Sequence, residues 1–91
     1  MTRYSKGANF ERELVKRYKD LGFPIVIRSA GSKGTFDLVA ISKEGKVYLV
    51  QAKTSRPRKS DVEKLQEMDC PPNCTILIIT PEKEMIINAR E

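Results

Sequence analysis

The chain has 91 residues, with 17 lysines and arginines against 12 aspartates and glutamates, no histidine, and a pI near 9.4. This length suits one small domain and excludes a second core of similar size, so we expect residues 1–91 to form a single domain. The basic balance favours a polyanionic partner, nucleic acid first. No stretch approaches the ~18 apolar residues of a membrane span, which favours an intracellular, cytoplasmic protein without a membrane partner.

The first predicted element is an amphipathic helix over residues 7–21. Apolar residues such as Phe10, Leu14 and Tyr18 recur at helical spacing, and charged residues fill the opposite side. Glu11 falls inside the apolar arc of this helix. Because burial of an unpaired carboxylate costs several kcal/mol, we expect a cation, a metal or a hydrogen-bond donor beside it. The alternative is a first-turn acid that is stabilised by the helix dipole.

A short strand is predicted over residues 23–28, with Pro24 at its start, where a missing N–H is tolerated. Residues 29–35 then form a connection rich in small residues. Its two glycines would let backbone N–H groups approach a phosphate, although the same composition is typical of any hairpin loop. No helix follows, as a P-loop would require, so this segment alone is only a weak indication of a phosphate site.

A β-hairpin is predicted next, from strands at residues 36–41 and 46–53. Gly45 suits a turn position that needs a positive φ. If residues 43–45 form a three-residue loop, Asp37 faces Gln51 across the pair. Directly opposed residues have Cβ atoms about 5 Å apart, so both side chains could reach one cation. A bulge could shift this register by one residue.

These strand ends predict a metal-dependent nuclease site. Lys53 lies two residues beyond Gln51 and so shares its face of the sheet. Mg²⁺ prefers oxygen ligands and few carboxylates, so the side chains of Asp37 and Gln51 with the Ala52 carbonyl could hold it, completed by Glu11 directly or through water. Lys53 would position or deprotonate the attacking water and offset phosphate charge. We expect Mn²⁺ to substitute for Mg²⁺.

The second half of the chain completes an α/β fold. A basic loop at residues 54–59 precedes a capping-box pattern at 60–63, which predicts a second helix. The apolar run 75–80 is then most simply a parallel strand reached by a crossover, and residues 85–87 form a short edge strand. The predicted order is αβββαββ, a mixed central sheet flanked by helices.

Cys70 and Cys74 bracket a short turn that contains two prolines. Without histidine, two thiols cannot complete a four-ligand zinc site within one chain. Two ordinary cysteines are the favoured interpretation, and a short-loop disulfide is the alternative.

Five blocks of the first half occur in one order: residues 6–13 (KGANFERE), 22–23 (GF), 28–32 (RSAGS), 37–40 (DLVA) and 51–53 (QAK). Together they resemble the archaeal-type Holliday junction resolvases of the PD-(D/E)XK nuclease superfamily. The resemblance covers about residues 6–54. It implies a restriction-endonuclease-like core and a magnesium-dependent homodimer that makes symmetric paired cuts in branched DNA, at four-way junctions.

The resemblance also implies roles for single residues. Glu11 corresponds to the family's metal-site acid, Ser32 to the serine of a mobile catalytic loop, and Asp37 and Lys53 to the core catalytic motif. The candidate DNA-binding residues are Lys6, Arg12, Lys16, Arg28, Ser29, Lys33, Arg56, Arg58 and Lys59. Arg12 corresponds to a DNA-contacting arginine beside the metal-site acid, and Arg28 to the arginine that ends the first strand.

The chain departs from the resolvase pattern in two ways. Gln51 stands where the family most often has Glu, which removes one negative charge and predicts weaker metal affinity rather than inactivity. The chain is also shorter after Lys53 than the resolvases it resembles, so we expect elements that form the dimer surface and read junction shape to be reduced or absent. Two rival functions remain open: a nuclease acting on flaps or duplex DNA, and a catalytically silent DNA-binding protein on the same scaffold.

Overall fold

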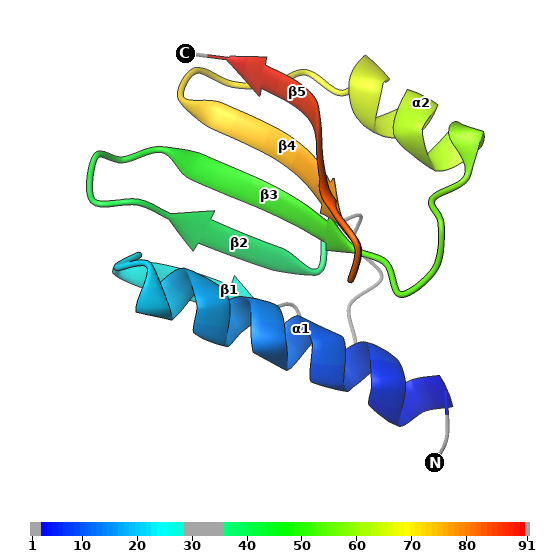
Figure 1. Ribbon diagram of the computed structural model, residues 1–91. Coiled ribbons are helices and arrows are strands. Elements are labelled where there is room, and N and C mark those ends of the chain that lie inside the picture. The colour runs from blue at the N-terminus through cyan, green and yellow to red at the C-terminus, as the bar shows by residue number, and fades with distance from the viewer. Residues whose placement is uncertain (1–2, 29–35, 91) are drawn as a thin grey trace.

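The computed structural model of the chain describes residues 3–28 and 36–90, with side chains from residue 9 onward. In this part of the chain two helices and five strands follow the predicted order αβββαββ (Figure 1). The elements are α1 (Arg3–Asp20), β1 (Ile25–Arg28), β2 (Leu38–Ile41), β3 (Val47–Ala52), α2 (Lys59–Glu67), β4 (Cys74–Ile79) and β5 (Glu84–Arg90). The predicted restriction-endonuclease-like α/β architecture is confirmed.

The described strands form one mixed sheet in the order β1-β2-β3-β4-β5. Strand β2 runs antiparallel to both of its neighbours, β1 and β3, whereas β3 and β4 are parallel and β5 returns antiparallel to β4. The parallel pair is reached through α2, as predicted for a crossover connection. The last strand was predicted at residues 85–87, but it spans Glu84–Arg90 because its pairing with β4 continues past an irregularity between Ile76 and Leu77.

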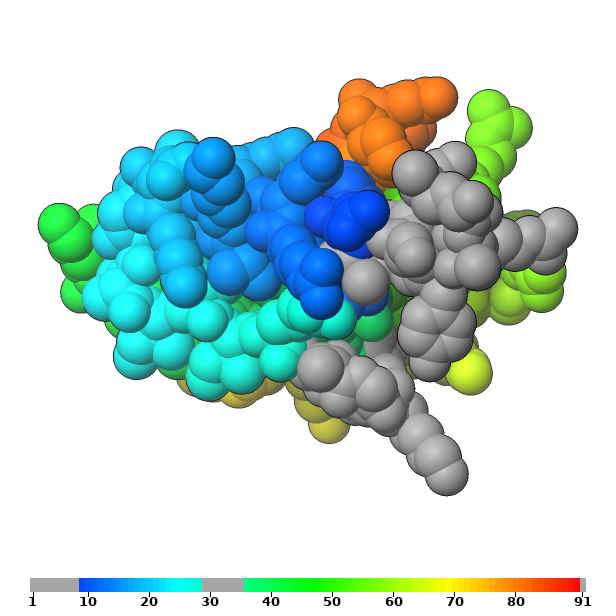
Figure 2. Space-filling model, turned by 90° about the horizontal axis from the view of Figure 1, so that it is seen from below, coloured from blue at the N-terminus to red at the C-terminus, as the bar shows by residue number. Residues whose placement is uncertain are grey.

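The two faces of the sheet carry separate apolar clusters, as the alternation of side chains along strands requires. On the α1 face the buried residues are Phe10, Leu14, Tyr18, Leu38, Ala40, Val50, Leu77 and Ile79. On the α2 face they are Leu65, Cys70, Cys74, Ile76 and Ile78. Figure 2 views the molecule from the α1 side and shows this helix extending along that face. No helix in the described residues is long and apolar enough to cross a membrane.

The predicted starts of the first helix and the first strand were wrong by a few residues. Helix α1 begins at Arg3 rather than at residue 7. Gly22, at φ +96°, ends the helical turn, and the Phe23 N–H donates to the Tyr18 carbonyl at 3.1 Å. The Phe23 ring then packs edge-on against Tyr18, with centroids 5.0 Å apart. Because these contacts hold Phe23 against the helix, β1 starts only at Ile25.

The start of α2 also differs from the predicted capping box. The helix begins at Lys59 with Arg58 as the N-cap residue, so neither Ser60 nor Glu63 takes the predicted role. Asp61 instead accepts a hydrogen bond from the Arg58 N–H at 3.1 Å. An acid in the first turn satisfies a free N–H group and is favoured by the helix dipole. Asp61 therefore fixes where α2 begins.

Both cysteines are buried thiols near the end of α2 and the start of β4. The Cys70 Sγ donates to the Cys74 carbonyl oxygen at 3.1 Å. Burial raises the pKa of Cys74 to about 11. The two residues thus help to close the α2-face core, in line with the favoured interpretation as ordinary cysteines.

Candidate active site

The β2–β3 hairpin has the predicted register. Leu38 pairs with Val50, and the pairing continues in step down to the turn. The Ser42 N–H donates to the Lys46 carbonyl at 2.9 Å, which leaves residues 43–45 as the three-residue loop. Gly45 adopts φ +86°, a conformation that glycine adopts without strain. The turn therefore sets the alignment of the two strand ends far from it.

Asp37 lies just before β2 and is bound to the end of β3. Its N–H donates to the Val50 carbonyl at 2.9 Å, and its Oδ2 accepts a hydrogen bond from the Ala52 N–H, also at 2.9 Å. These contacts fall on either side of Gln51. The structure thus brings Asp37 to the stretch of β3 that the register predicts, with its carboxylate fixed by a backbone donor.

Lys53 continues β3 by one residue, since its N–H donates to the Ile79 carbonyl of β4 at 3.0 Å. Its Nζ lies 3.5 Å from the Asp61 Oδ2 of α2. Gln51 lies in the same strand two positions from Leu49, which packs in the α2-face core. Gln51 and Lys53 accordingly lie on the α2 side of the sheet, as their spacing predicts.

Glu11 lies on the other side of the sheet, in α1. Its Oε1 accepts a hydrogen bond from the Arg28 Nε at 3.1 Å, and the two side chains are 22% and 27% exposed. The half-buried carboxylate therefore has the cationic partner that was expected of it. Arg28 ends β1, so this ion pair ties the helix to the first strand.

These groups gather at one end of the sheet, where β1, β3 and β4 finish and β2 begins (Figure 1). Within residues 3–28 and 36–90, however, the hydrogen bonds and ion pairs link Glu11 to Arg28, Asp37 to Ala52 and Lys53 to Asp61, and none joins these three pairs to one another. The convergence of Glu11, Asp37, Gln51 and Lys53 on one cation stays a prediction.

The donor atoms suit magnesium. Over the described residues, the Asp37 carboxylate accepts the single hydrogen bond from Ala52, which leaves Oδ1 for a cation. Gln51 and the Ala52 carbonyl add neutral oxygens from the facing strand, and Mg²⁺ binds such oxygens with few carboxylates. No group of three or more His, Cys, Asp or Glu side chains able to hold a metal occurs in the described residues. A metal held by the described residues alone would need neutral oxygens in addition to carboxylates.

The candidate DNA-binding cations divide into two groups. Arg12 and Lys16 are exposed on α1, and Arg56, Arg58 and Lys59 are exposed around the start of α2. Lys59 also pairs with Glu63 at 4.0 Å. The side chain of Lys6 and residues Ser29, Ser32 and Lys33 lie outside the described part of the chain, so the structure places none of these four candidates.

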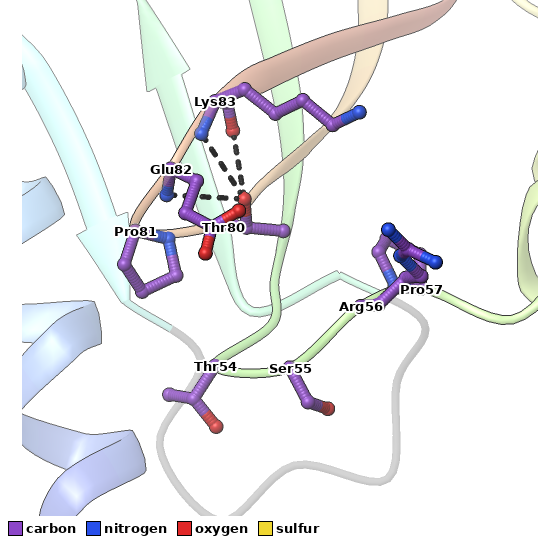
Figure 3. Close-up of a pocket in the computed structure, with 8 residues that line it drawn as sticks. All are labelled: Thr54, Ser55, Arg56, Pro57, Thr80, Pro81, Glu82 and Lys83. Carbon is purple, nitrogen blue, oxygen red and sulfur yellow. Dashed lines mark hydrogen bonds between the residues drawn. The ribbon is translucent and has the colours of Figure 1, made fainter.

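A cleft of about 310 Å³ adjoins Lys53. It separates the segment Thr54–Pro57 from the β4–β5 turn Thr80–Lys83 (Figure 3). The Thr80 hydroxyl accepts hydrogen bonds from the N–H groups of Glu82 and Lys83, at 3.3 and 3.2 Å, and so stiffens the turn. None of Glu11, Asp37, Gln51 and Lys53 lines this cleft. It is a neighbour of the candidate site rather than the site itself.

Sequence analysis missed Asp61. This residue contacts Lys53 and caps α2, and its carboxyl pKa is lowered, first by the hydrogen bond from the Arg58 backbone and then by the positive charge of Lys53. The signal was present, because Asp61 stands among the first residues of a predicted helix. It was attributed to the neighbouring Ser60, and no sequence pattern linked it to Lys53.

Comparison with known proteins identifies the family of this chain. Residues 2–68 match the model of the family described as archaeal Holliday junction resolvase (Hjc). The chain belongs to this family. The matched segment contains every candidate residue of the site, from Glu11 to Lys53, together with the helix that carries Asp61. Strands β4 and β5, which complete the sheet and line the adjoining cleft, follow it.

A curated relative supports the same assignment. The protein named crossover junction endodeoxyribonuclease Hjc from Methanocaldococcus jannaschii is 47% identical to this chain over 68 residues. The aligned region covers 69% of this chain and 49% of the relative. The chain thus spans about half the length of the curated relative that it matches.

Proposed function

We propose that this chain is a Mg²⁺-dependent, structure-selective DNA endonuclease that resolves four-way junctions by symmetric paired cuts. The observation that carries the proposal is the hydrogen bond between Asp37 and Ala52, which aligns the first acid of the motif with Gln51 and Lys53 in a chain of the resolvase family. The name of the M. jannaschii relative supports the same class of substrate.

In this proposal the metal ligands are the side chains of Asp37, Gln51 and Glu11 with the Ala52 carbonyl oxygen. Bound Mg²⁺, or Mn²⁺ in its place, would supply charge neutralisation and lower the pKa of a coordinated water. For Glu11 to take part, its Arg28 partner must share the carboxylate, since Oε1 is already hydrogen-bonded. Oε2 is the atom of Glu11 that we assign to the cation or to a water on it.

Lys53 provides the positive charge that the chemistry needs beside the scissile phosphate. An ammonium at the end of β3 would offset charge on the phosphate oxygens and orient the attacking water through its N–H groups. Ser32 is proposed to act in the same site, by resemblance to the family. Asp37 contributes a fixed carboxylate, because the Ala52 N–H holds it in one orientation.

The DNA backbone would follow the exposed cations on both sides of this sheet end. On α1 these are Arg12 and Lys16, and after β3 they are Arg56, Arg58 and Lys59. Lys6, Arg28, Ser29 and Lys33 complete the proposed contact set. Such contacts bring affinity without base preference, and their contribution falls steeply with salt.

We place the strand over these cations rather than inside the cleft beside Lys53. Figure 3 shows the Glu82 carboxylate directed into the gap between the two segments that line the cleft. A phosphate there would meet a negative charge, in addition to the positive charges of Arg56 and Lys83. The outer surface of residues 54–59 offers cations without that repulsion.

Two symmetric cuts require two equivalent sites, so we propose a homodimer of single-domain chains, acting in the cytoplasm where the DNA is. The edge strand β1 supports it, since Ile25 and Ile27 are 45% and 58% exposed on a strand whose outer edge is unpaired in the described residues. A second copy covering these residues would remove apolar surface from water.

The test is cleavage of a four-way junction with Mg²⁺, compared with a linear duplex of the same sequence and with Asp37→Asn. The amide oxygen of Asn can still accept the Ala52 hydrogen bond, so this variant removes the charge and keeps the contact. We expect the junction to be cut, the duplex to be spared, and the variant to bind the junction in Ca²⁺ without cutting it. Equal cutting of the duplex would support a nuclease of flaps or ordinary DNA.

Gln51 favours the second candidate function, a DNA-binding protein without catalysis. An amide in place of a carboxylate leaves the proposed site with Asp37 and Glu11 as its acids, and Glu11 is already paired with Arg28. A purified protein that binds the junction but does not cut it in Mg²⁺ or Mn²⁺ would establish this function and exclude the first.

A further inference from the structure

Asp61 is the residue of α2 through which this helix reaches the candidate site. Its Oδ2 lies 3.5 Å from the Lys53 Nζ and 3.1 Å from the Arg58 backbone nitrogen. The side chains of Lys53 and Asp61 are 32% and 26% exposed, so the pair is partly withdrawn from water. One carboxylate oxygen therefore contacts both the start of the helix and the lysine at the end of β3.

The backbone contact makes this carboxylate a fixed anchor. The Arg58 N–H has no partner within the first turn of a helix, and Asp61 supplies it. The hydrogen bond from the Arg58 N–H, followed by the positive charge of Lys53, lowers the pKa of the Asp61 carboxyl, and the positive end of the helix dipole also favours the ionised acid. The position of the Asp61 carboxylate is therefore fixed by the position of the first turn of α2.

Lys53 by contrast has a long, flexible side chain. A lysine carries about 2 kcal/mol of rotamer entropy, and a catalytic group gains from being held near its working geometry before the substrate arrives. The backbone of Lys53 is fixed by its hydrogen bond to Ile79, but that contact does not determine where the ammonium lies. Among the described residues, Asp61 is the acid that forms an ion pair with it.

We propose that Asp61 is a positioning residue that holds the Lys53 ammonium at the end of β3 in the orientation needed for cleavage. The role in cleavage rests on the nuclease function proposed above. The holding of Lys53 does not, because it concerns the protein without DNA or metal. Asp61 touches neither the substrate nor the reacting atoms, and it acts through Lys53.

The experiment compares Asp61→Asn with Glu63→Gln. The Asn side-chain oxygen can still accept the Arg58 hydrogen bond, so the cap is kept while the charge that attracts Lys53 is lost. Glu63→Gln removes the same charge from the same helix and breaks a lysine pair as well, the one with Lys59 at 4.0 Å. Melting temperatures of the two variants then show whether α2 is equally intact in both.

The first measurement is the mobility of the Lys53 Cε methylene by ¹³C NMR relaxation in the free protein. We expect the order parameter of this methylene to fall in Asp61→Asn and to equal the wild-type value in Glu63→Gln. Equal order in all three proteins would overturn the proposal, whether or not the protein cuts DNA. A protein that shows the expected change in order without cleaving junctions would contradict the nuclease function alone.

The second measurement is the single-turnover rate of junction cleavage at saturating protein, with junction affinity measured in Ca²⁺. We expect Asp61→Asn to lower the rate about tenfold with affinity unchanged, since misplacing a catalytic group by about an ångström can cost up to 10²-fold. Glu63→Gln should keep the wild-type rate. A wild-type rate in Asp61→Asn would overturn the role of Asp61 in cleavage, and a higher rate would show that Asp61 restrains Lys53.

Discussion

Two ion pairs flank the end of the sheet, and they differ in which partner is the candidate catalytic group. On the α1 face the candidate is the acid, Glu11, and Arg28 is the counter-charge at 3.1 Å. On the α2 face the candidate is the base, Lys53, and Asp61 is the counter-charge at 3.5 Å. Each helix thus contributes one side chain to a pair whose other member ends a strand.

The two candidate catalytic groups differ in the contact that each must change before it can act. A metal bound by Glu11 would have to share the carboxylate with the Arg28 guanidinium. The hydrogen bond between Arg28 and Glu11 is charge-assisted and therefore costly to break. Lys53 needs no such exchange, because an ammonium can contact a phosphate with one N–H while another faces Asp61. We infer that the α2 side is ready before substrate binds and that the α1 side adjusts.

Removal of the Lys53 side chain should have the largest effect on cleavage. We expect Lys53→Ala to lower the single-turnover rate of junction cleavage in Mg²⁺ by about a thousandfold, ~4 kcal/mol of transition-state stabilisation, while junction affinity in Ca²⁺ changes little. Lys64→Ala, which removes an exposed lysine from α2, is the matched control and should cut at the wild-type rate. Cleavage by Lys53→Ala at near the wild-type rate would exclude a catalytic role for this lysine.

The hairpin register was predictable from the sequence, whereas the partner of Glu11 was predictable only in part. The hairpin register followed from the turn, because Gly45 and a three-residue loop determine the pairing from Leu38 to Val50. Local patterns of this kind are visible in a sequence. The partner of Glu11 was predicted only as a type, a cation, a metal or a donor. Its identity as Arg28 depends on how α1 crosses β1, which the periodicity of a helix does not specify.

The α2 side could not be derived in the same way. The contact between Lys53 and Asp61 joins a strand end to a helix start across the basic loop, and it exists because α2 begins at Lys59. The predicted capping box placed Ser60 at the N-cap, a shift of two residues from the observed Arg58. The angle between Asp61 and the apolar residues of the helix is fixed by the helical repeat and does not depend on the first residue, so the capping error did not turn Asp61 away. What a local pattern does not specify is where the start of α2 lies relative to the end of β3.

Breaking the α1 pair tests whether Glu11 binds the metal or only neutralises Arg28. We expect Glu11→Gln to lower the cleavage rate about a hundredfold, ~2.7 kcal/mol, and to raise the Mg²⁺ concentration needed for half of the maximal rate. If Glu11 serves Arg28 alone, the variant should lose stability in urea unfolding without a change in Mg²⁺ dependence.

The control for that variant is Glu13→Gln, on the exposed side of the same helix. It removes an equal charge from α1 without touching Arg28. We expect its rate and Mg²⁺ dependence to equal those of the wild type, and a similar rise in the Mg²⁺ requirement in both variants would mean that general electrostatics accounts for the effect of Glu11→Gln.

The α1 face also contains a buried group that titrates at high pH. Burial, followed by the negative charge of Glu84, raises the pKa of Tyr18 to about 12. The unfolded chain loses this proton near pH 10, so the stabilising contribution is complete below pH 10 and is lost as the pH rises toward 12. We expect a loss of roughly 2 kcal/mol in the free energy of unfolding over that range, and Tyr18→Phe should remove this part of the pH dependence. Urea unfolding at pH 9 and pH 11 measures how the free energy of unfolding changes with pH in the wild type and in Tyr18→Phe. An equal change in both proteins would contradict the assignment to Tyr18.

Gln51→Glu should have the smallest effect, and it should act on the Mg²⁺ requirement. A carboxylate at this position adds a negative charge near Asp37, so we expect the Mg²⁺ concentration needed for half of the maximal rate to fall about threefold, with the rate at saturating Mg²⁺ preserved. A marked loss of activity would count against Gln51 as a ligand.

The same substitution places a second acid on the α2 side of the sheet, on the face that Lys53 shares. If the new carboxylate competes with Asp61 for the ammonium, the order of the Lys53 side chain should change as the Mg²⁺ affinity rises. Combining Gln51→Glu with Asp61→Asn separates the two effects: a lower Mg²⁺ requirement should persist in the double variant, whereas the rate should regain part of what Asp61→Asn loses if either acid can hold Lys53. In that case an amide at position 51 avoids competition with Asp61 for the Lys53 ammonium, and weaker metal binding is the consequence.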